Sequence, residues 1–389
     1  MTDFENILPL WHALEGAGAD YVLATVVDVD GPSYRKPGAR MLIAADGRRA
    51  GSVSGGCLEA EVAKRAWWLT ERGPVVERYS TAADDGDMPY GSGCGGVVYI
   101  LLERRSTAAP LLKELEAAFN ARERLAIATV LEGAEIGHRV FAGSAIAEAK
   151  PASGTSESLD GTLKHFALQA LDRLQCIDQR ISTGGNETRV WVDYRAARPG
   201  LWIFGAGDDA KPLLRLAREL GWFAAIADGR SHLATHARFP AANAVITLPM
   251  LPNRNPSIFA NVKASDAVIL MTHSFDQDSH ILASLLPRDV LPAYLGVLGP
   301  QRRTREVLAE AAQLLALPNA EQRAEQWLAQ LHAPTGLDLG AETPAAIALS
   351  IIAEVQQTLN NGSALPLRQV RAVDKKATAG SSTRVARSE

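Results

Sequence analysis

The sequence has only three cysteines among 389 residues, too few for a disulfide framework. An odd and sparse set of cysteines is typical of a protein of a reducing compartment. The chain also lacks an apolar run of the ~18 residues that a transmembrane helix needs, and its first residues are acidic where a signal peptide would be basic. We therefore expect a cytoplasmic protein with no membrane partner, whose cysteines are free thiols.

A large charge of one sign is also missing. The formal net charge is -4, so the molecule as a whole does not attract nucleic acid, and we expect no nucleic-acid partner. Hydrophobic residues are abundant, at 47% of the chain. Because single cores usually stop growing at about 250 to 300 residues, a chain of this length is expected to form two domains.

The domain boundary is predicted near Arg195, where a Pro-Gly pair precedes an abrupt apolar strand. We predict a first domain over residues 1–195 and a second over residues 196–368. Residues 369–389 have no apolar period and are expected to be a disordered tail. The stretch 150–161 is rich in serine and glycine and is expected to be an exposed loop.

The first domain mixes strand and helix patterns. Runs rich in β-branched residues, bounded by glycine and aspartate, predict strands at 21–29, 39–45 and 96–103. Helical periodicity appears at 58–72 and 109–122. We assign this half as α/β, with α+β as the alternative.

The second domain alternates strands with helices, which favours a mainly parallel sheet joined by right-handed crossovers. The fold class predicted for the chain is therefore α/β, with a Rossmann-like second domain. Its strands are expected at 201–207, 223–228, 243–248, 266–273 and 293–299.

The first of these strands ends in a glycine-rich loop. Gly205 and Gly207 lie before a helix, and Asp228 ends the next strand, as in a dinucleotide-binding fingerprint. Asp208 and Asp209, however, are expected to cap the helix and to repel a phosphate. NAD(P) is therefore a doubtful cofactor, and an NAD(P)-dependent oxidoreductase is the alternative function.

Two cysteines lie in glycine-rich turns. Cys57 follows Ser54, Gly55 and Gly56 and precedes a predicted helix, whose N-terminus would lower the thiol pKa. As an alternative, this cysteine is a small buried hydrophobic residue in a tight turn.

Cys94 lies among Gly93, Gly95 and Gly96, where the backbone can approach a ligand closely and offer N–H groups to an anion. Burial in a tight turn is the alternative here too. Two thiols in such turns favour a soft metal or sulfur transfer, because a turn needs glycine but has no use for sulfur. Cys176 lies in a helical pattern and is expected to be a packing residue.

Other candidate residues carry charge. Arg35 and Arg40 could pair with a phosphate, or could be solvated loop charges. His273, Asp276 and Asp278 follow a predicted strand at its carboxyl end, where open α/β sheets place ligands, and could bind a ligand or a metal. A histidine that caps a turn is the alternative for His273. A zinc site is not expected, since no C-x-x-C spacing is present.

Several motifs of the sequence resemble the xanthine dehydrogenase accessory factor (XdhC/CoxI) family. They are "GPSYRKPGARMLI", "GSVSGGCLEAEV", "GSGCGG", "IFGAG", "MTHSFDQD", "YLGVLGPQRR" and "APTGLDLGAETPAAIALSIIAEV", in the expected order. The resemblance implies an XdhC/CoxI domain followed by a Rossmann domain. One departure is Asp208, because the family commonly has histidine at this position.

The resemblance also implies a function. Such proteins bind molybdenum cofactor, help it acquire its sulfido ligand with a cysteine desulfurase, and deliver it to an apo molybdenum hydroxylase of the xanthine dehydrogenase type. We therefore expect a homodimeric chaperone rather than an enzyme, bound to molybdopterin or a dinucleotide form. Cys57 and Cys94 are the candidate metal-guarding or sulfur-transfer thiols. The expected cofactor contacts are Arg35, Ser54, Gly55, Gly56, Gly93, Gly95, Gly96, Gly205, Gly207, Asp228 and His273.

Overall fold

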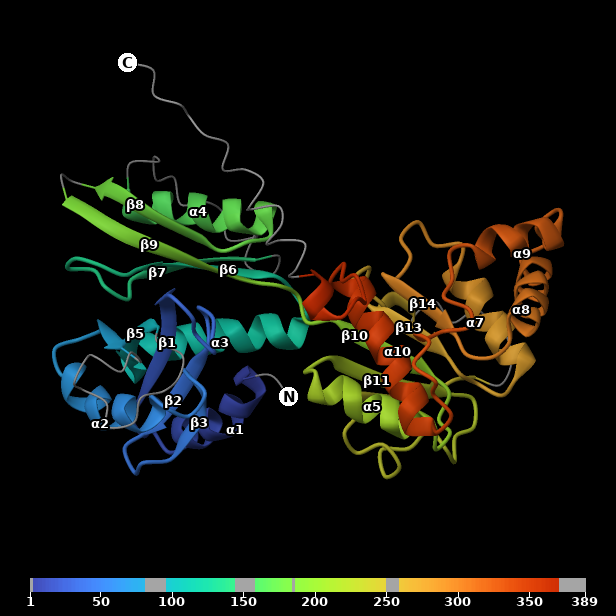
Figure 1. Ribbon diagram of the computed structural model, residues 1–389, viewed down its shortest axis with the longest axis horizontal. Coiled ribbons are helices and arrows are strands. Elements are labelled where there is room, and N and C mark those ends of the chain that lie inside the picture. The colour runs from blue at the N-terminus through green and yellow to red at the C-terminus, as the bar shows by residue number, and fades with distance from the viewer. Residues whose placement is uncertain (1–2, 81–95, 144–157, 184–185, 250–258, 371–389) are drawn as a thin grey trace, which may run out of the picture. The chain divides into compact units, whose positions relative to one another are not determined.

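The computed structural model describes residues 3–80, 96–143, 158–183, 186–249 and 259–370. The chain forms two compact units that divide between Arg198 and Pro199, three residues after the boundary predicted from the sequence (Figure 1). None of the helices described is both long enough and apolar enough to span a membrane.

The first unit contains two antiparallel sheets in the described residues. The strands of one sheet lie in the order β3-β2-β1-β5-β4, and those of the other in the order β7-β6-β9-β8. The strands are β1 (Tyr21–Asp30), β2 (Arg40–Ala44), β3 (Arg49–Gly51), β4 (Val75–Ser80), β5 (Val97–Arg104), β6 (Leu125–Val130), β7 (Arg139–Gly143), β8 (Ile177–Thr183) and β9 (Asn186–Arg195). The helices are α1 (Asp3–Gly16), α2 (Glu59–Leu69), α3 (Arg105–Ala121) and α4 (Leu159–Arg173). Because its strands pair antiparallel, this unit is of the α+β type, the alternative that we predicted from the sequence.

Alternation along β1 explains how the layers pack. Val22, Ala24 and Val26 face α2. On the opposite face, Leu23 packs mainly with α1 and α3, and Val27 packs with the second sheet, since successive side chains of a strand point to opposite faces. The second sheet buries its other face against α4 (Figure 1). The first sheet is therefore covered on both sides, and its ends carry the loops that can reach solvent.

The second unit is a parallel sheet with the strand order β12-β11-β10-β13-β14. Its strands are β10 (Gly200–Phe204), β11 (Phe223–Asp228), β12 (Ala244–Thr247), β13 (Ala267–Leu270) and β14 (Tyr294–Val297). Its helices are α5 (Ala210–Glu219), α7 (Phe275–Leu285), α8 (Gln301–Leu314), α9 (Ala320–Leu328) and α10 (Pro344–Leu359). The predicted Rossmann-like architecture is confirmed, because each predicted strand overlaps an observed one.

Helices cover both faces of this parallel sheet. α5 and α10 pack on one face, and α7, α8 and α9 pack on the other. The start of α10 follows its sequence signals, since the Thr343 hydroxyl accepts the Ala346 N–H at 3.3 Å and Pro344 is the first helical residue. This helix packs against α5 and the sheet.

The prediction that Cys176 packs within a helix is wrong. α4 ends at Arg173 and Leu174 adopts the left-handed conformation, so Cys176 lies beyond the helix and is exposed. The expected loop 150–161 falls outside the described residues up to 157, and its last residues already belong to α4. Apart from residues 369 and 370, the expected tail is also outside the described residues.

Candidate functional site

The segment that leads into β5 at Gly96 and the loop 31–39 that follows β1 meet at one end of the larger sheet of the first unit. β1 ends at Asp30, directly opposite the start of β5 at Val97. The chain then enters the loop 31–39. A Cβ atom on Gly96 would lie 2.2 Å from the Pro32 carbonyl oxygen, so only glycine allows the backbones to approach this closely.

The loop 52–58, which precedes α2, is folded around the carboxylate of Glu59. Oε1 of Glu59 accepts hydrogen bonds from the Ser52 hydroxyl at 2.6 Å, the Val53 N–H at 3.1 Å and the Ser54 N–H at 2.8 Å. Oε2 accepts from the Ser54 hydroxyl at 2.5 Å. Burial acts to raise the pKa of Glu59, but these hydrogen bonds outweigh it and lower the pKa to about 2. Glu59 is therefore ionised at neutral pH and fixes the loop.

Ser54 is the second fixed point of this loop, which we call the Cys57 loop. Its hydroxyl oxygen accepts the N–H groups of Gly56 at 3.2 Å and Leu58 at 3.0 Å. Ser54 is buried, and its hydroxyl also donates to Glu59, the first residue of α2. Gly56 has φ +109°, a conformation that favours glycine. The sequence placed Ser54 and Gly56 correctly in a tight turn beside the thiol.

Cys57 lies two residues before α2 begins and is exposed. The alternative that it is a small buried hydrophobic residue is therefore wrong. The first turn of α2 carries Glu59 and Glu61, so this helix terminus already has negative charge beside the thiol. Cys94, Gly93 and Gly95 lie outside the described residues.

Tyr34 connects the loop 31–39 with the Cys57 loop. A Cβ atom on Gly55 would lie 3.5 Å from the Tyr34 ring, so the ring lies beside this glycine at a distance that leaves room for a Cβ atom between them. Arg35, which is half-buried, places its guanidinium carbon 5.6 Å from the centre of the same ring. Arg35, Gly55 and Cys57, which the sequence proposed together, thus lie on neighbouring loops.

Arg40 belongs to the core and does not support the phosphate role considered from the sequence. Its Nη2 donates to Asp193 Oδ2 at 2.7 Å, and its Nη1 donates to the Gly38 carbonyl at 3.1 Å. The two side chains of the ion pair are only 6% and 2% exposed. Arg40 therefore joins the two sheets and fixes the base of the loop 31–39.

Sequence reasoning missed Glu59 and Tyr34. Glu59 lies five residues after Ser54, outside the three-residue spacing of a capping box, so no standard pattern marks it. Tyr34 lies within the quoted motif "GPSYRKPGAR", but nothing in a single sequence shows which motif residues stay exposed. The only available signal was an aromatic residue amid loop-forming residues.

A groove of about 690 Å³ lies at the opposite end of the same sheet, between the end of α1 and α3. Its lining includes Phe141 and the ion pair between Glu15 and Arg105. The Arg105 side chain and the Tyr21 hydroxyl donate to Glu15 and, although burial opposes them, lower its pKa to about 2. None of the residues predicted for the site lines this groove.

In the second unit, the strand order reverses between β10 and β13, which is where open α/β sheets bind ligands. Gly205 follows β10 with φ +133°, and a Cβ atom there would lie 2.7 Å from the Met271 carbonyl oxygen. A Cβ atom on Gly207 would lie 2.3 Å from Asp209 Oδ1. Both glycines thus allow close packing at this edge.

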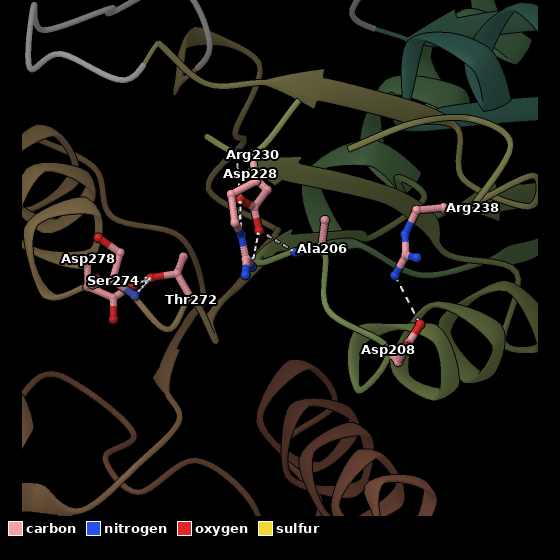
Figure 2. Close-up of polar contacts among 8 residues, drawn as sticks. All are labelled: Ala206, Asp208, Asp228, Arg230, Arg238, Thr272, Ser274 and Asp278. Atoms are coloured by element: carbon pink, nitrogen blue, oxygen red, sulfur yellow. Dashed lines mark hydrogen bonds and ion pairs between the residues drawn. The ribbon is translucent and has the colours of Figure 1, made fainter. Parts of the chain in front are cut away.

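Asp228 is fully buried at this edge, and both of its carboxylate oxygens are engaged (Figure 2). Oδ2 accepts the Ala206 N–H at 2.7 Å and Arg230 Nη2 at 2.7 Å, and Oδ1 accepts Arg230 Nε at 3.0 Å. Burial acts to raise the pKa of Asp228, but these bonds hold it below its ordinary value. The carboxylate that would accept a hydrogen bond from a ribose hydroxyl therefore already accepts hydrogen bonds from other groups of the protein.

The expectation that Asp208 and Asp209 cap α5 is wrong. Asp209 occupies the N-cap position, but its side chain makes no capping hydrogen bond. Asp208 is exposed and pairs with Lys211 at 2.7 Å. It also pairs with Arg238 at 2.9 Å (Figure 2). These cations offset the charge of Asp208, so its repulsion of a phosphate is weaker than the sequence suggested.

His273 is exposed at the end of β13 and is not the cap of the following turn. Ser274 caps α7, because its hydroxyl accepts an N–H of the first turn at 3.2 Å. The neighbouring Asp278 is buried and accepts hydrogen bonds from Thr272 at 2.6 Å and Arg303 at 2.8 Å. Burial raises the pKa of Asp278, and these partners only partly oppose it.

The described residues contain no group of three or more His, Cys, Asp or Glu side chains that could hold a metal ion. The suggestion that His273, Asp276 and Asp278 bind a metal together is therefore wrong. His12 contacts Glu116 at 2.9 Å, and His138 contacts Asp160 at 2.6 Å.

Comparisons with known proteins agree with this architecture. Residues 201–355 match the family model of the XdhC Rossmann domain, and residues 14–80 match that of the XdhC and CoxI family. A Bacillus subtilis protein, named as a probable component of xanthine dehydrogenase, is 28% identical over 91% of this chain and 97% of its own length. The Escherichia coli protein named "Molybdenum cofactor insertion chaperone PaoD" is 27% identical over 88% of this chain and 84% of its own.

A solved structure is also similar. A crystal structure of a xanthine dehydrogenase from Bacillus halodurans covers 94% of this chain and 97% of its own, with 27% identity and a TM-score of 0.66. The similarity extends over both units, and the two family models together match more than half of the chain. The chain belongs to the XdhC and CoxI family.

Proposed function

We propose that this protein is a molybdenum cofactor insertion chaperone whose binding site is formed by the Cys57 loop and the loop 31–39. The observation that carries this proposal is the position of the Tyr34 ring beside Gly55, which places an exposed thiol and a basic loop next to each other. The name of the Escherichia coli relative, which covers most of both chains, supports the same role.

The chemistry of the two loops matches the cargo. Molybdenum cofactor carries a soft, sulfur-bound metal at one end and a phosphate at the other. The exposed Cys57 thiol can contact the metal end, because soft thiolates suit soft centres. The guanidinium of Arg35 can donate to the phosphate as a charge-assisted pair. Gly96 lets the loop 31–39 pack closely against the sheet. Because Gly93, Cys94 and Gly95 directly precede Gly96 in the sequence, we include them in the proposed site.

We further propose that the protein supports sulfuration of the cargo and passes it to an apo molybdenum hydroxylase of the xanthine dehydrogenase type. A cysteine desulfurase would be the sulfur donor, and a homodimer would be the working form in the cytoplasm. The bound cargo is molybdopterin or its dinucleotide form. A role of Gly205, Gly207, Asp228 and His273 in holding its nucleotide part stays a prediction. The engaged Asp228 gives no support to an NAD(P)-dependent oxidoreductase.

The experiment that tests this function uses the full chain, purified from cells that make molybdenum cofactor and coexpressed with an apo hydroxylase. We expect a molybdenum-bound pterin to be released on denaturation. Cys57→Ser should reduce client activation at least about 10-fold without loss of thermal stability, because this thiol is exposed. Cys176→Ser is the matched control, since Cys176 is exposed outside the site.

Two results would contradict the proposal. If the wild-type chain releases no pterin and does not increase client activity, it is not an insertion chaperone. If Cys57→Ser activates the client as well as Cys176→Ser does, the chaperone role can stand but Cys57 has no part in it.

A further inference from the structure

The loop 31–39 is anchored at both ends and displays one aromatic ring between the anchors. At its start, Gly96 packs against the Pro32 carbonyl. At its end, the Gly38 carbonyl accepts hydrogen bonds from Arg40 and Arg195, and the Gly38 N–H donates to the Val26 carbonyl at 2.7 Å. A loop fixed in this way holds its central residues in place before any ligand arrives.

Tyr34 is the aromatic residue displayed by this loop, and the residue is 73% exposed. Its ring lies beside Gly55, which has no side chain to cover it. Arg35 lies beside the ring at 5.6 Å, and the Ser33 hydroxyl donates to the Arg35 carbonyl at 2.9 Å, which stiffens the turn. Arg35 and Gly55 thus lie beside the ring, while most of Tyr34 stays open to solvent.

The Cys57 loop beside the ring is equally fixed. Glu59 binds two backbone N–H groups and two hydroxyls of that loop, and Cys57 lies exposed two residues after Gly55. An open aromatic surface, a glycine backbone and a thiol therefore lie on adjoining rigid loops. Such a surface can stack a planar heterocycle, as aromatic side chains do with nucleobases.

We infer that Tyr34 is the stacking platform for the planar heterocycle of the cargo, which in molybdenum cofactor is the pterin. The inference rests on the proposed function and adds a binding residue to the same site. The pterin lies along the Tyr34 ring and across the Gly55 backbone, which directs its metal-bearing end toward Cys57. Arg35 and Lys36, on the same loop, carry the positive charge that suits the phosphate.

The test compares Tyr34→Leu, Tyr34→Phe and Trp68→Ala in the full chain. Leucine keeps an apolar contact with Gly55 but has no aromatic face, whereas phenylalanine keeps the face. Trp68 is a matched control, because it is an aromatic residue of α2 that is 56% exposed. The probe is pterin-6-carboxylate, a fluorescent planar pterin, whose quenching is titrated at constant ionic strength. Molybdenum-bound pterin retained after purification is measured in parallel.

We expect Tyr34→Leu to weaken probe binding at least about 10-fold, and Tyr34→Phe and Trp68→Ala to change it less than about 2-fold. Equal melting temperatures would show that the variants are folded. Equal binding of probe and cargo by Tyr34→Leu and the wild type overturns the inference and leaves the chaperone function standing. If the wild type binds the probe through Tyr34 but retains no molybdenum, the stacking site stands and the proposed function fails. A wild type that does not bind the probe overturns the inference.

Discussion

Replacement of Glu59 by glutamine tests how firmly the Cys57 loop is built. The pKa of Glu59 is lowered from 4.5 to about 2, because hydrogen bonds from Ser52 and Ser54 outweigh the effect of burial. At about 1.4 kcal/mol per pKa unit this shift corresponds to about 3 kcal/mol, and because Glu59 is only half-buried, solvent screening reduces the stabilisation of the ionised carboxylate to about 1 to 2 kcal/mol. Glutamine lacks the charge and one of the two acceptor oxygens, so most of this stabilisation should be lost.

Hydrogen exchange measured by mass spectrometry on peptides spanning 50–60 is the direct assay. In Glu59→Gln, exchange of the Val53 and Ser54 amides should accelerate at least about 10-fold, because their shared acceptor is weakened. Glu61→Gln is the matched control, because it removes the same charge from the same helical turn. Unchanged exchange in Glu59→Gln, or equal acceleration in both variants, would refute the assignment of Glu59 as the residue that fixes the loop.

The sign of the pH dependence follows from the same shift. A carboxyl group whose pKa is lowered by folding contributes stability that is complete above its ordinary pKa of 4.5 and is lost as the pH falls toward 2. Protection of the Cys57 loop should therefore be constant from neutral pH to about 5 and should decrease below 4.5. In Glu59→Gln this dependence should disappear.

Two further predictions concern the core and the Rossmann edge. Arg40→Met should lower the free energy of unfolding by about 2 kcal/mol in denaturant titrations, because buried Asp193 then keeps only the more exposed Arg195 as a partner. Arg48→Met at an exposed pair should change this free energy by less than about 0.5 kcal/mol. Equal effects of the two would contradict the buried bridge. Calorimetry should detect no NAD(P) binding tighter than about 100 μM, because Arg230 and a backbone N–H already engage Asp228. Micromolar binding would show that Arg230 moves aside for a dinucleotide.

The regular elements could be predicted from the sequence because their signals are local. Alternating strands and helices over residues 201–299 predicted a parallel sheet, and the glycine at 205 predicted a tight turn after its first strand. The start of α10 followed from Thr343 and Pro344. The helix expected around Cys176 failed because periodicity does not mark the residue at which a helix ends, and α4 ends three residues earlier.

The sequence by itself determined that Cys57 lies in a glycine turn before a helix and that Arg35 lies in a loop. Only the tertiary structure decided which charges bind which partners. Arg35 and Arg40 are five residues apart and chemically alike, yet Arg40 is buried because β9 brings Asp193 against it from 153 residues away. Likewise, Tyr34 meets Gly55 only because separate strands end at the same edge of the sheet. Contacts between distant segments leave no local pattern, since they depend on strand pairing and sheet packing rather than on neighbouring residues.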